Sequence, residues 1–283
     1  DLDEFEYATD VCVDANGKVG VVERPVRDDR IARTLIDTYL LGDARVSAAA
    51  DLSRRSFDPE LMDTEQVSFE EFQHCLRDLR RINLCTLAYR PTLTWLGHVV
   101  KRTGRKHLRI LDVGFGYGDM LREIDRWAAK RGITVELTGV DLNPWSAKAA
   151  ALATPPGVRI DYRTGDLFDL APDTACDVVI SSLFTHHLDD ALLVRFLRWM
   201  DGHAALGWFS NDLHRHAVSH TFACAMVAAL PVNRLVVHDA PLSVARAFTR
   251  GDWERLLADA GFAPAAVSVE WFTPFRYGVG RIK

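Results

Sequence analysis

The sequence predicts an α/β fold, with a doubly wound, mostly parallel sheet and an N-terminal helical cap. From residue 109 onward, apolar β-branched runs alternate with helix-like stretches, the pattern of βα units around a parallel sheet. The chain has 283 residues, 48% of them hydrophobic, which suits one large domain with an appended lobe. We therefore expect a cap in residues 1–104 and an α/β domain in residues 105–283.

The N-terminal part contains few regular patterns. Residues 11–23 read as a small hairpin that turns at Asn16-Gly17. Residues 67–100 predict two helices, and Ser68 and Glu71 are spaced like a capping box before the first. For residues 1–60, the sequence predicts only this hairpin and a contact with either the lid or a second subunit. A homodimer is therefore one of the expected alternatives.

The α/β part follows from local patterns. Strands are predicted at the apolar, β-branched runs of residues 109–114, 135–141, 158–163, 177–182 and 205–212. Helical patterns fill the gaps at 118–131, 145–152 and 189–201. No helical pattern separates residues 263–272 from 274–282, so these two segments can only pair as an antiparallel hairpin at the sheet edge.

Composition restricts the class of partner. The formal charge is −5, from 39 acidic and 34 basic residues, which disfavours nucleic acid and anionic membranes. Five scattered cysteines form no CxxC pair, so we expect a reducing cytoplasm. The acidic opening DLDEFEYATD is unlike a signal peptide, and we expect no membrane span. A small molecule is the expected partner.

Three glycines follow the first predicted strand, as Asp112-x-Gly114-x-Gly116-x-Gly118. A glycine turn between a strand and a helix lets the backbone approach a ligand where a side chain would collide. The spacing is tighter than GxGxxG and no P-loop lysine is nearby, which disfavours a nucleotide phosphate. A tight turn without a ligand is the alternative explanation.

Acidic residues end the next two predicted strands. Asp141 stands where a carboxylate accepts both hydroxyls of a ribose. In Gly165-Asp166-Leu167, the acidic side chain is placed to accept an exocyclic amine, and the leucine to pack against the ring. A single aspartate at a strand end is often a turn former, but three at successive ends favour a nucleoside-like ligand.

The segments DVGFGYG, GVDLNP, GDLFDL and DVVISSLFTHHL resemble the class I S-adenosylmethionine-dependent methyltransferases, of the bacterial small-molecule type, over residues 108–283. The resemblance implies a seven-stranded sheet that binds S-adenosylmethionine and releases S-adenosylhomocysteine. It places Gly114, Gly116 and Gly118 beside the methionine moiety. The full set of cofactor residues that it implies is Asp112, Gly114, Phe115, Gly116, Gly118, Asp141, Leu142, Asp166, Leu167, Ser181 and Ser182.

Residues 78–96 resemble the helices that close over the cofactor in small-molecule methyltransferases. The implied lid contacts are Arg80, Asn83 and Tyr89, although a solvated helix face would explain them equally well. Phe184 is expected on the way to the acceptor. Arg246 is expected either to meet an acidic group of the acceptor or to form a surface salt bridge.

Methyl transfer to a hydroxyl or an activated carbon needs a general base near neutral pH, and histidine is the usual choice. His186 and His187 follow the fourth predicted strand, and His214 and His216 follow the fifth. We expect Asp212 to orient one of these rings. The alternative is that the two histidines of FTHHL only start a helix.

We expect no metal. A hard-cation site needs several convergent oxygens, and Ser181-Ser182-Leu183 occupies the strand end where the resemblance would require an acidic ligand. Nucleic-acid acceptors are disfavoured too, because Asn143-Pro144-Trp145 is not the turn of exocyclic-amine enzymes and no cysteine follows a proline.

The predicted function is methyl transfer from S-adenosylmethionine to a small aromatic or polyketide-like acceptor of bacterial secondary or quinone metabolism, at oxygen. The apolar start of residues 216–262 suits the wall of a hydrophobic acceptor pocket. C-methylation of a phenolic or quinone ring is an alternative that uses the same base. A cofactor-binding scaffold without catalysis is an alternative of another class.

Overall fold

The computed structural model describes residues 7–13, 19–25, 50–170 and 176–283. The chain divides into two compact units, Asp1–Ser47 and Ala48–Lys283. In the first unit, β1 (Tyr7–Val13) and β2 (Val19–Pro25) pair antiparallel, with Val13 opposite Val19. This pairing confirms the predicted hairpin, whose strands extend further on both sides. Its Asn16-Gly17 turn lies outside the described residues.

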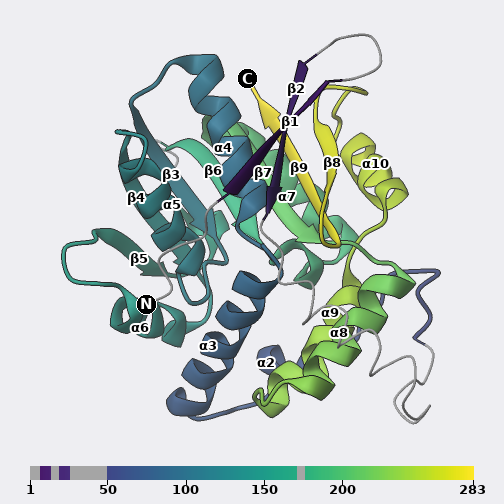
Figure 1. Ribbon diagram of the computed structural model, residues 1–283. Coiled ribbons are helices and arrows are strands. Elements are labelled where there is room, and N and C mark those ends of the chain that lie inside the picture. Colours follow the sequence, from purple (N-terminus) through teal and green to yellow (C-terminus); the bar gives the residue numbers. More distant parts are fainter. Residues whose placement is uncertain (1–6, 14–18, 26–49, 171–175) are drawn as a thin grey trace. The chain divides into compact units, whose positions relative to one another are not determined.

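The second unit is built on a seven-stranded sheet of order β5-β4-β3-β6-β7-β9-β8 (Figure 1). Its strands are β3 (His107–Val113), β4 (Thr134–Asp141), β5 (Ile160–Thr164), β6 (Cys176–Ser182), β7 (Ala204–Leu213), β8 (Ser268–Phe272) and β9 (Arg276–Ile282). The first five are parallel, whereas β9 runs antiparallel to β7 and β8 antiparallel to β9. The predicted sheet and its terminal hairpin are confirmed.

The strand order reverses between β3 and β6, because the chain builds β4 and β5 on one side of β3 before it crosses to the other. In an open α/β sheet, such a reversal leaves a crevice outside the carboxyl ends of the two central strands. The predicted cofactor residues lie in the last residues of β3, β4 and β6 or just after β3, β4 and β5. The topology therefore brings them to one edge of the sheet.

Helices cover both faces of the sheet. The helices α4 (Arg90–Thr103), α5 (Asp119–Ala129) and α6 (Pro144–Ala153) lie on one face, where Leu96 and Leu121 pack with Ile110. On the other face, α7 (Asp190–His203) and α10 (Arg250–Asp259) bury Phe196 and Trp253 in a second apolar cluster. This arrangement confirms the doubly wound fold and holds the strand ends rigidly.

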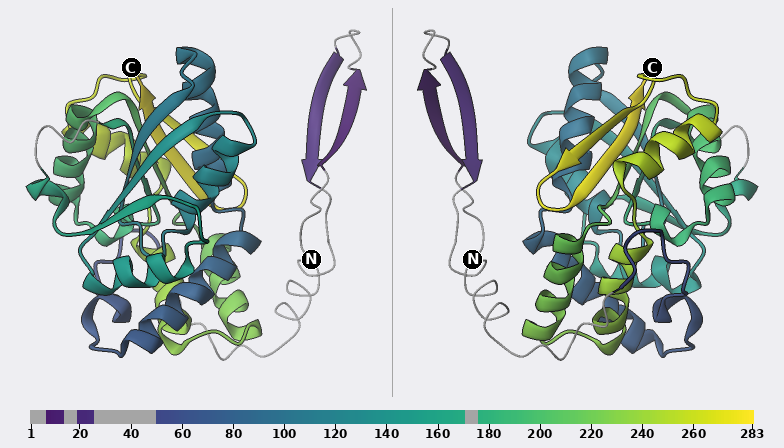
Figure 2. Two further views of the ribbon diagram at one scale, coloured as in Figure 1. Left: turned by 90° about the vertical axis from the view of Figure 1, so that its left-hand side faces the viewer. Right: turned by 90° about the vertical axis from the view of Figure 1, so that its right-hand side faces the viewer.

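Four further helices lie beyond the carboxyl ends of the parallel strands, where the predicted site is, as Figures 1 and 2 both show. They are α2 (Leu61–Thr64), α3 (Phe69–Cys85), α8 (Ala217–Ala229) and α9 (Arg234–Arg246). Cys75 and Ile82 of α3 pack with Met226 of α8 and Leu235 of α9 in a small apolar core of their own.

The predicted capping box before α3 forms only in part. The Ser68 hydroxyl accepts the backbone N–H of Glu71, while the Glu71 carboxylate turns away to accept Nε–H of Arg234. The cap helices and the sheet belong to the same compact unit, so a division at residue 104 stays a prediction. Within the described part of the chain, no helix combines the length and the apolar character that a membrane crossing needs.

Candidate functional site

A cavity of about 610 Å³ opens at the carboxyl ends of β3, β4 and β6. This size suits a cofactor together with a small acceptor. The strand ends form one wall, and α3, α8 and α9 form the opposite wall. Phe222, Ala223 and Met226 make the α8 side apolar, in agreement with the hydrophobic wall expected from the sequence.

The glycine turn forms as predicted, but glycine is required at its three positions for different structural reasons. All three have left-handed backbones, with φ of 73° at Gly114, 50° at Gly116 and 69° at Gly118. At Gly116 the space for a Cβ atom is free except for one contact at 3.8 Å, so its backbone borders the cavity. At Gly118 a Cβ atom would lie 2.5 Å from the Tyr162 hydroxyl oxygen.

Gly118 also does not line the cavity, unlike Gly114 and Gly116. The structure therefore does not place it beside a methionine moiety: it starts α5 and leaves room for Tyr162. At Gly114 a Cβ atom would lie 2.5 Å from the Phe184 ring, so this glycine admits the phenylalanine to the cavity wall.

Asp112 and Asp119 are buried at the base of the turn. Asp112 lines the cavity and is buried, and its Oδ1 has no hydrogen-bond partner among the described residues. Burial, together with the charges of Asp119 and Asp141, raises the pKa of Asp112 well above its ordinary value. A cationic or N–H group of a ligand would satisfy this carboxyl.

The lid helices contact Asp119. The Tyr89 hydroxyl donates to its Oδ2 over 2.5 Å, and the Asn83 amide approaches the same atom at 3.4 Å. Arg80, Asn83 and Tyr89 all line the cavity. The predicted lid residues thus adjoin the glycine turn.

Asp141 ends β4 with its carboxylate facing the cavity. Its two oxygens accept the backbone N–H groups of Gly116 and Asn143, each at 2.9 Å. Burial raises the pKa of Asp141, although both hydrogen bonds oppose the shift. Each carboxylate oxygen retains a further lone pair, and Leu142 beside it also lines the cavity.

The remaining cofactor candidates divide into two groups. Asp166 accepts the backbone N–H of Phe168 at 2.9 Å, and both Asp166 and Leu167 line the cavity after β5. Ser182 also lines it and accepts the Asn211 amide, at 3.1 Å. Ser181 does not: it is buried under the sheet edge, and its hydroxyl has no partner among the described residues.

His186 pairs with Asp212, as one of the predicted combinations. Its Nδ1 lies 2.7 Å from Oδ1 of Asp212, and Oδ2 of that carboxylate accepts the Thr185 hydroxyl. Burial disfavours the Asp212 charge, but the His186 ring and these hydrogen bonds hold its pKa well below the ordinary value. Asp212 therefore fixes the ring and leaves Nε2 facing the cavity side.

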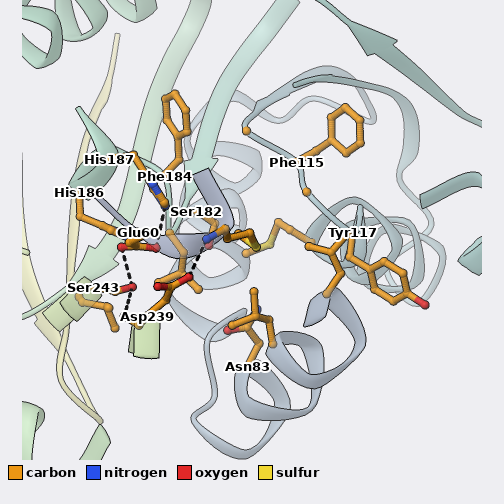
Figure 3. Close-up of a pocket in the computed structure, with 18 of the residues that line it drawn as sticks. Glu60, Asn83, Phe115, Tyr117, Ser182, Phe184, His186, His187, Asp239 and Ser243 are labelled. Atoms are coloured by element: carbon orange, nitrogen blue, oxygen red, sulfur yellow. Dashed lines mark hydrogen bonds and ion pairs between the residues drawn. The ribbon is translucent and has the colours of Figure 1, made fainter. Parts of the chain in front are cut away.

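Two carboxylates from α2 and the residue before it complete this cluster. Nδ1 of His187 lies 2.8 Å from Oδ2 of Asp63. Nε2 of His186 lies 3.6 Å from Oε1 of Glu60, and Nε2 of His187 lies 3.8 Å from Oε2 of Glu60. Figure 3 shows Glu60 between the imidazoles and Ser243, whose hydroxyl donates to Oε1 over 2.9 Å.

Burial and the neighbouring carboxylates shift the pKa of His187 in opposite directions. Burial alone would lower the pKa of His187, but the hydrogen bond to Asp63 and the charge of Glu60 raise it above the ordinary value. Glu60 itself is 2% exposed, so its carboxylate depends on these partners.

Besides Gly118, Ser181 and Asp212, three further predicted residues do not line the cavity. His214 accepts the Trp271 indole N–H at 3.3 Å, and His216 caps α8 by accepting the Val218 N–H. Arg246 is buried and donates to the backbone carbonyls of His186 and His187, so it forms neither a surface salt bridge nor part of the cavity lining. Arg246 is a positioning residue for the histidine loop.

Sequence reasoning missed Glu60 and Asp63, because both lie in or next to the segment that carried no assignment. The available signal was indirect: two adjacent histidines at a ligand-binding edge need two carboxylate partners, and Asp212 supplies only one. Asp239, which also lines the cavity, accepts the N–H groups of Leu61 and Met62 and so anchors α2 to α9.

Comparisons with known proteins agree with this fold. Residues 110–207 match the sequence model of the methyltransferase domain family. No curated protein sequence matches. The plantazolicin methyltransferase BpumL, solved with a triazolic analogue and S-adenosylhomocysteine, shares 14% identity over 76% of this chain and 96% of its own, with a TM-score of 0.56.

The human N-acetylserotonin methyltransferase, solved with S-adenosylmethionine, is 14% identical over 96% of this chain and 79% of its own, also with a TM-score of 0.56. Likeness at this level of identity establishes the fold. Residues 110–207 thus match a methyltransferase domain model, and Ala48–Lys283 has the Rossmann-like fold of the class I methyltransferases.

Proposed function

We propose that this protein transfers a methyl group from S-adenosylmethionine to an oxygen of a small, hydrophobic aromatic or polyketide-like acceptor. One observation carries the proposal: a single cavity joins Asp141 at the end of β4 to the two histidines after β6. The first suits a cofactor ribose, and the second suits an acceptor hydroxyl. The BpumL and N-acetylserotonin methyltransferase structures support the cofactor assignment, because they hold S-adenosylhomocysteine and S-adenosylmethionine.

The cofactor end of the cavity fits the proposed cofactor. Asp141 offers a free lone pair on each oxygen to the ribose hydroxyls, and the unpartnered Oδ1 of Asp112 suits the amino group of the methionine moiety. Asp166 and Leu167, which line the cavity after β5, are proposed to face the adenine amine and ring. When bound, the sulfonium supplies an electrophilic methyl group.

The acceptor end has to orient a nucleophile and remove its proton. Phe222, Ala223 and Met226 would bury an apolar ring, which keeps water away from the reacting oxygen. The His186 and His187 imidazoles stand at the edge of that wall, with Nδ1 of each held by a carboxylate. Their Nε2 atoms are the groups placed to receive a proton from a phenolic hydroxyl.

The test is formation of S-adenosylhomocysteine with a panel of phenols and enolic polyketides. We expect turnover with at least one acceptor, a large loss in Asp141→Ala, and no loss in Asp161→Ala, which removes an exposed aspartate from β5. A carbon-13 label on the methyl group then separates an O-methyl product from a C-methyl product by chemical shift. Cofactor binding without turnover on any acceptor would favour a non-catalytic scaffold.

A further inference from the structure

We propose that Glu60, His186 and His187 form a binding site for one divalent transition-metal ion, best matched by Zn²⁺, at the acceptor end of the cavity. One ligand atom from each residue lies within 4.8 Å of the others. Around a tetrahedral zinc ion with bonds of about 2.0–2.1 Å, neighbouring ligand atoms lie about 3.4 Å apart. Nε2 of His186 lies 3.6 Å from Oε1 of Glu60, and Nε2 of His187 lies 3.8 Å from Oε2, the other oxygen of the same carboxylate. Each separation is close to the tetrahedral value, so the carboxylate faces both nitrogens at ligand spacing.

The orientation of both rings is that of metal ligands. A histidine that binds a metal almost always donates its other ring N–H to a carboxylate, a carbonyl or water, which fixes the tautomer. Here Nδ1 of His186 contacts Asp212 at 2.7 Å, and Nδ1 of His187 contacts Asp63 at 2.8 Å. Both Nε2 lone pairs are thereby directed to the same side, toward Glu60 (Figure 3).

The Glu60 carboxylate is fixed in the same way. Ser243 donates to its Oε1 over 2.9 Å, and Nε of Arg246 lies 3.8 Å from the same atom. Arg246 also holds the carbonyls of both histidines, so one guanidinium positions the loop and the carboxylate together. These contacts fix the three ligand side chains before any ion arrives.

Charge favours a dication at this position. Three carboxylates, Glu60, Asp63 and Asp212, contact the two rings; Glu60 and Asp212 are buried, and Asp63 is exposed. With both imidazoles neutral, these three negative charges exceed the one positive charge that lies against Glu60, the Arg246 guanidinium at 3.8 Å. A divalent cation would compensate this negative charge, and so would one proton on each ring. A metal-binding experiment distinguishes the two cases.

The ligand set selects the metal. Mg²⁺ and Ca²⁺ prefer oxygen ligands, whereas two imidazoles and one carboxylate are typical of catalytic zinc sites that keep one position open. All three residues line the cavity, so that open position faces the space assigned to the acceptor.

This inference rests on the proposed function and changes one part of it, because the metal ion replaces the imidazoles in activating the acceptor hydroxyl. With the ion bound, both imidazoles are ligands, and an acceptor hydroxyl on the open position loses its proton to water because the metal lowers its pKa. A lone pair of that oxygen then bonds the methyl carbon, and the carbon–sulfur bond breaks with its electron pair on sulfur. The products are a methyl ether and S-adenosylhomocysteine.

The test is titration of the full chain, freed of metal by a chelator, with Zn²⁺ alone against a chromophoric competitor. We expect one Zn²⁺ per chain. Asp63→Asn removes an orienting carboxylate and should weaken binding about 10–100-fold, and loss of a ligand in Glu60→Gln or His187→Asn should weaken it further, by more than about 100-fold. His187 is more exposed than Glu60, so His187→Asn keeps the test open if Glu60→Gln does not fold.

The chain offers a matched control in its other histidine pair. His214 and His216 have ring centroids 5.2 Å apart and lie outside the cavity lining, so His214→Asn should leave Zn²⁺ binding unchanged. Absence of stoichiometric binding, or binding that Glu60→Gln and His187→Asn leave intact, would overturn the inference. Calorimetry with S-adenosylmethionine on the same samples reports separately on the proposed function.

Discussion

Nδ1 of His186 lies 2.7 Å from Oδ1 of Asp212, which ties the loop after β6 to the end of β7. The second carboxylate oxygen of Asp212 accepts the Thr185 hydroxyl and the backbone N–H of His186. All of these groups are buried. One carboxylate thus holds the position of the histidine loop against the sheet.

Replacing this carboxylate should be costly. In Asp212→Asn an amide N–H₂ replaces one of the two oxygens that accept hydrogen bonds, and the buried charge of the carboxylate is lost. We expect the free energy of unfolding to fall by about 3 kcal/mol, because buried donors lose a charged acceptor. Urea denaturation measures it, with exposed Asp161→Asn as the control, expected within about 0.5 kcal/mol of the unaltered chain. Equal losses in the two variants would contradict this role.

An alanine at Gly118 should cost stability in two ways: through strain in the left-handed backbone and through a clash with Tyr162. Gly132 also has a left-handed φ, 62°, but a Cβ atom there meets nothing within 4 Å. Gly132→Ala should therefore cost only the left-handed strain, about 1–2 kcal/mol. Gly118→Ala should cost more, because Tyr162 must move as well. The free energies of unfolding of the two variants test this. Similar values would show that Tyr162 does not exclude a side chain at position 118.

The pair between Asp177 of β6 and Arg109 of β3 predicts a pH dependence of stability. Asp177 accepts the Arg109 backbone N–H at 2.8 Å and its guanidinium at 3.2 Å. Burial disfavours the charge, but these bonds lower the pKa of Asp177 below its ordinary value. A carboxyl with a lowered folded-state pKa stabilises above its unfolded pKa of about 3.9, and this contribution is lost as the pH falls through the folded pKa.

Asp177→Asn should therefore destabilise the protein at neutral pH, and the difference from the unaltered chain should shrink as the pH falls below about 4. Urea denaturation at several pH values between neutral and strongly acidic conditions measures this difference. A difference that stays constant over that range would contradict the assigned pKa shift.

The α/β part could be predicted because its signals are local. Each β-branched run ending in a glycine or aspartate became a strand, and parallel strands bring their carboxyl ends to one edge, so Asp112, Asp141 and Asp166 could be placed together. The terminal hairpin followed from the absence of a helix between its strands.

The acceptor end could be predicted only in part. The pairing of His186 with Asp212 follows from adjacent strands, but Glu60 and Asp63 reach the histidines by long-range packing of α2 against α9, which no local pattern shows. The opposite error occurred at His214 and His216: they follow a strand at the right edge, but β9 and α8 engage them outside the cavity. Arg246 looked like a surface residue because its buried carbonyl partners are not visible in sequence.

The most direct test of the central claim is calorimetric titration of the full chain with S-adenosylmethionine and with S-adenosylhomocysteine. We predict that both bind with one site per chain, that Asp141→Ala weakens binding by about 1–3 kcal/mol because buried polar groups lose a partner, and that Asp161→Ala binds like the unaltered chain. If the folded, unaltered chain binds neither compound, the cavity at the carboxyl ends of β3 and β4 is not a cofactor site, and the proposed methyl transfer is wrong.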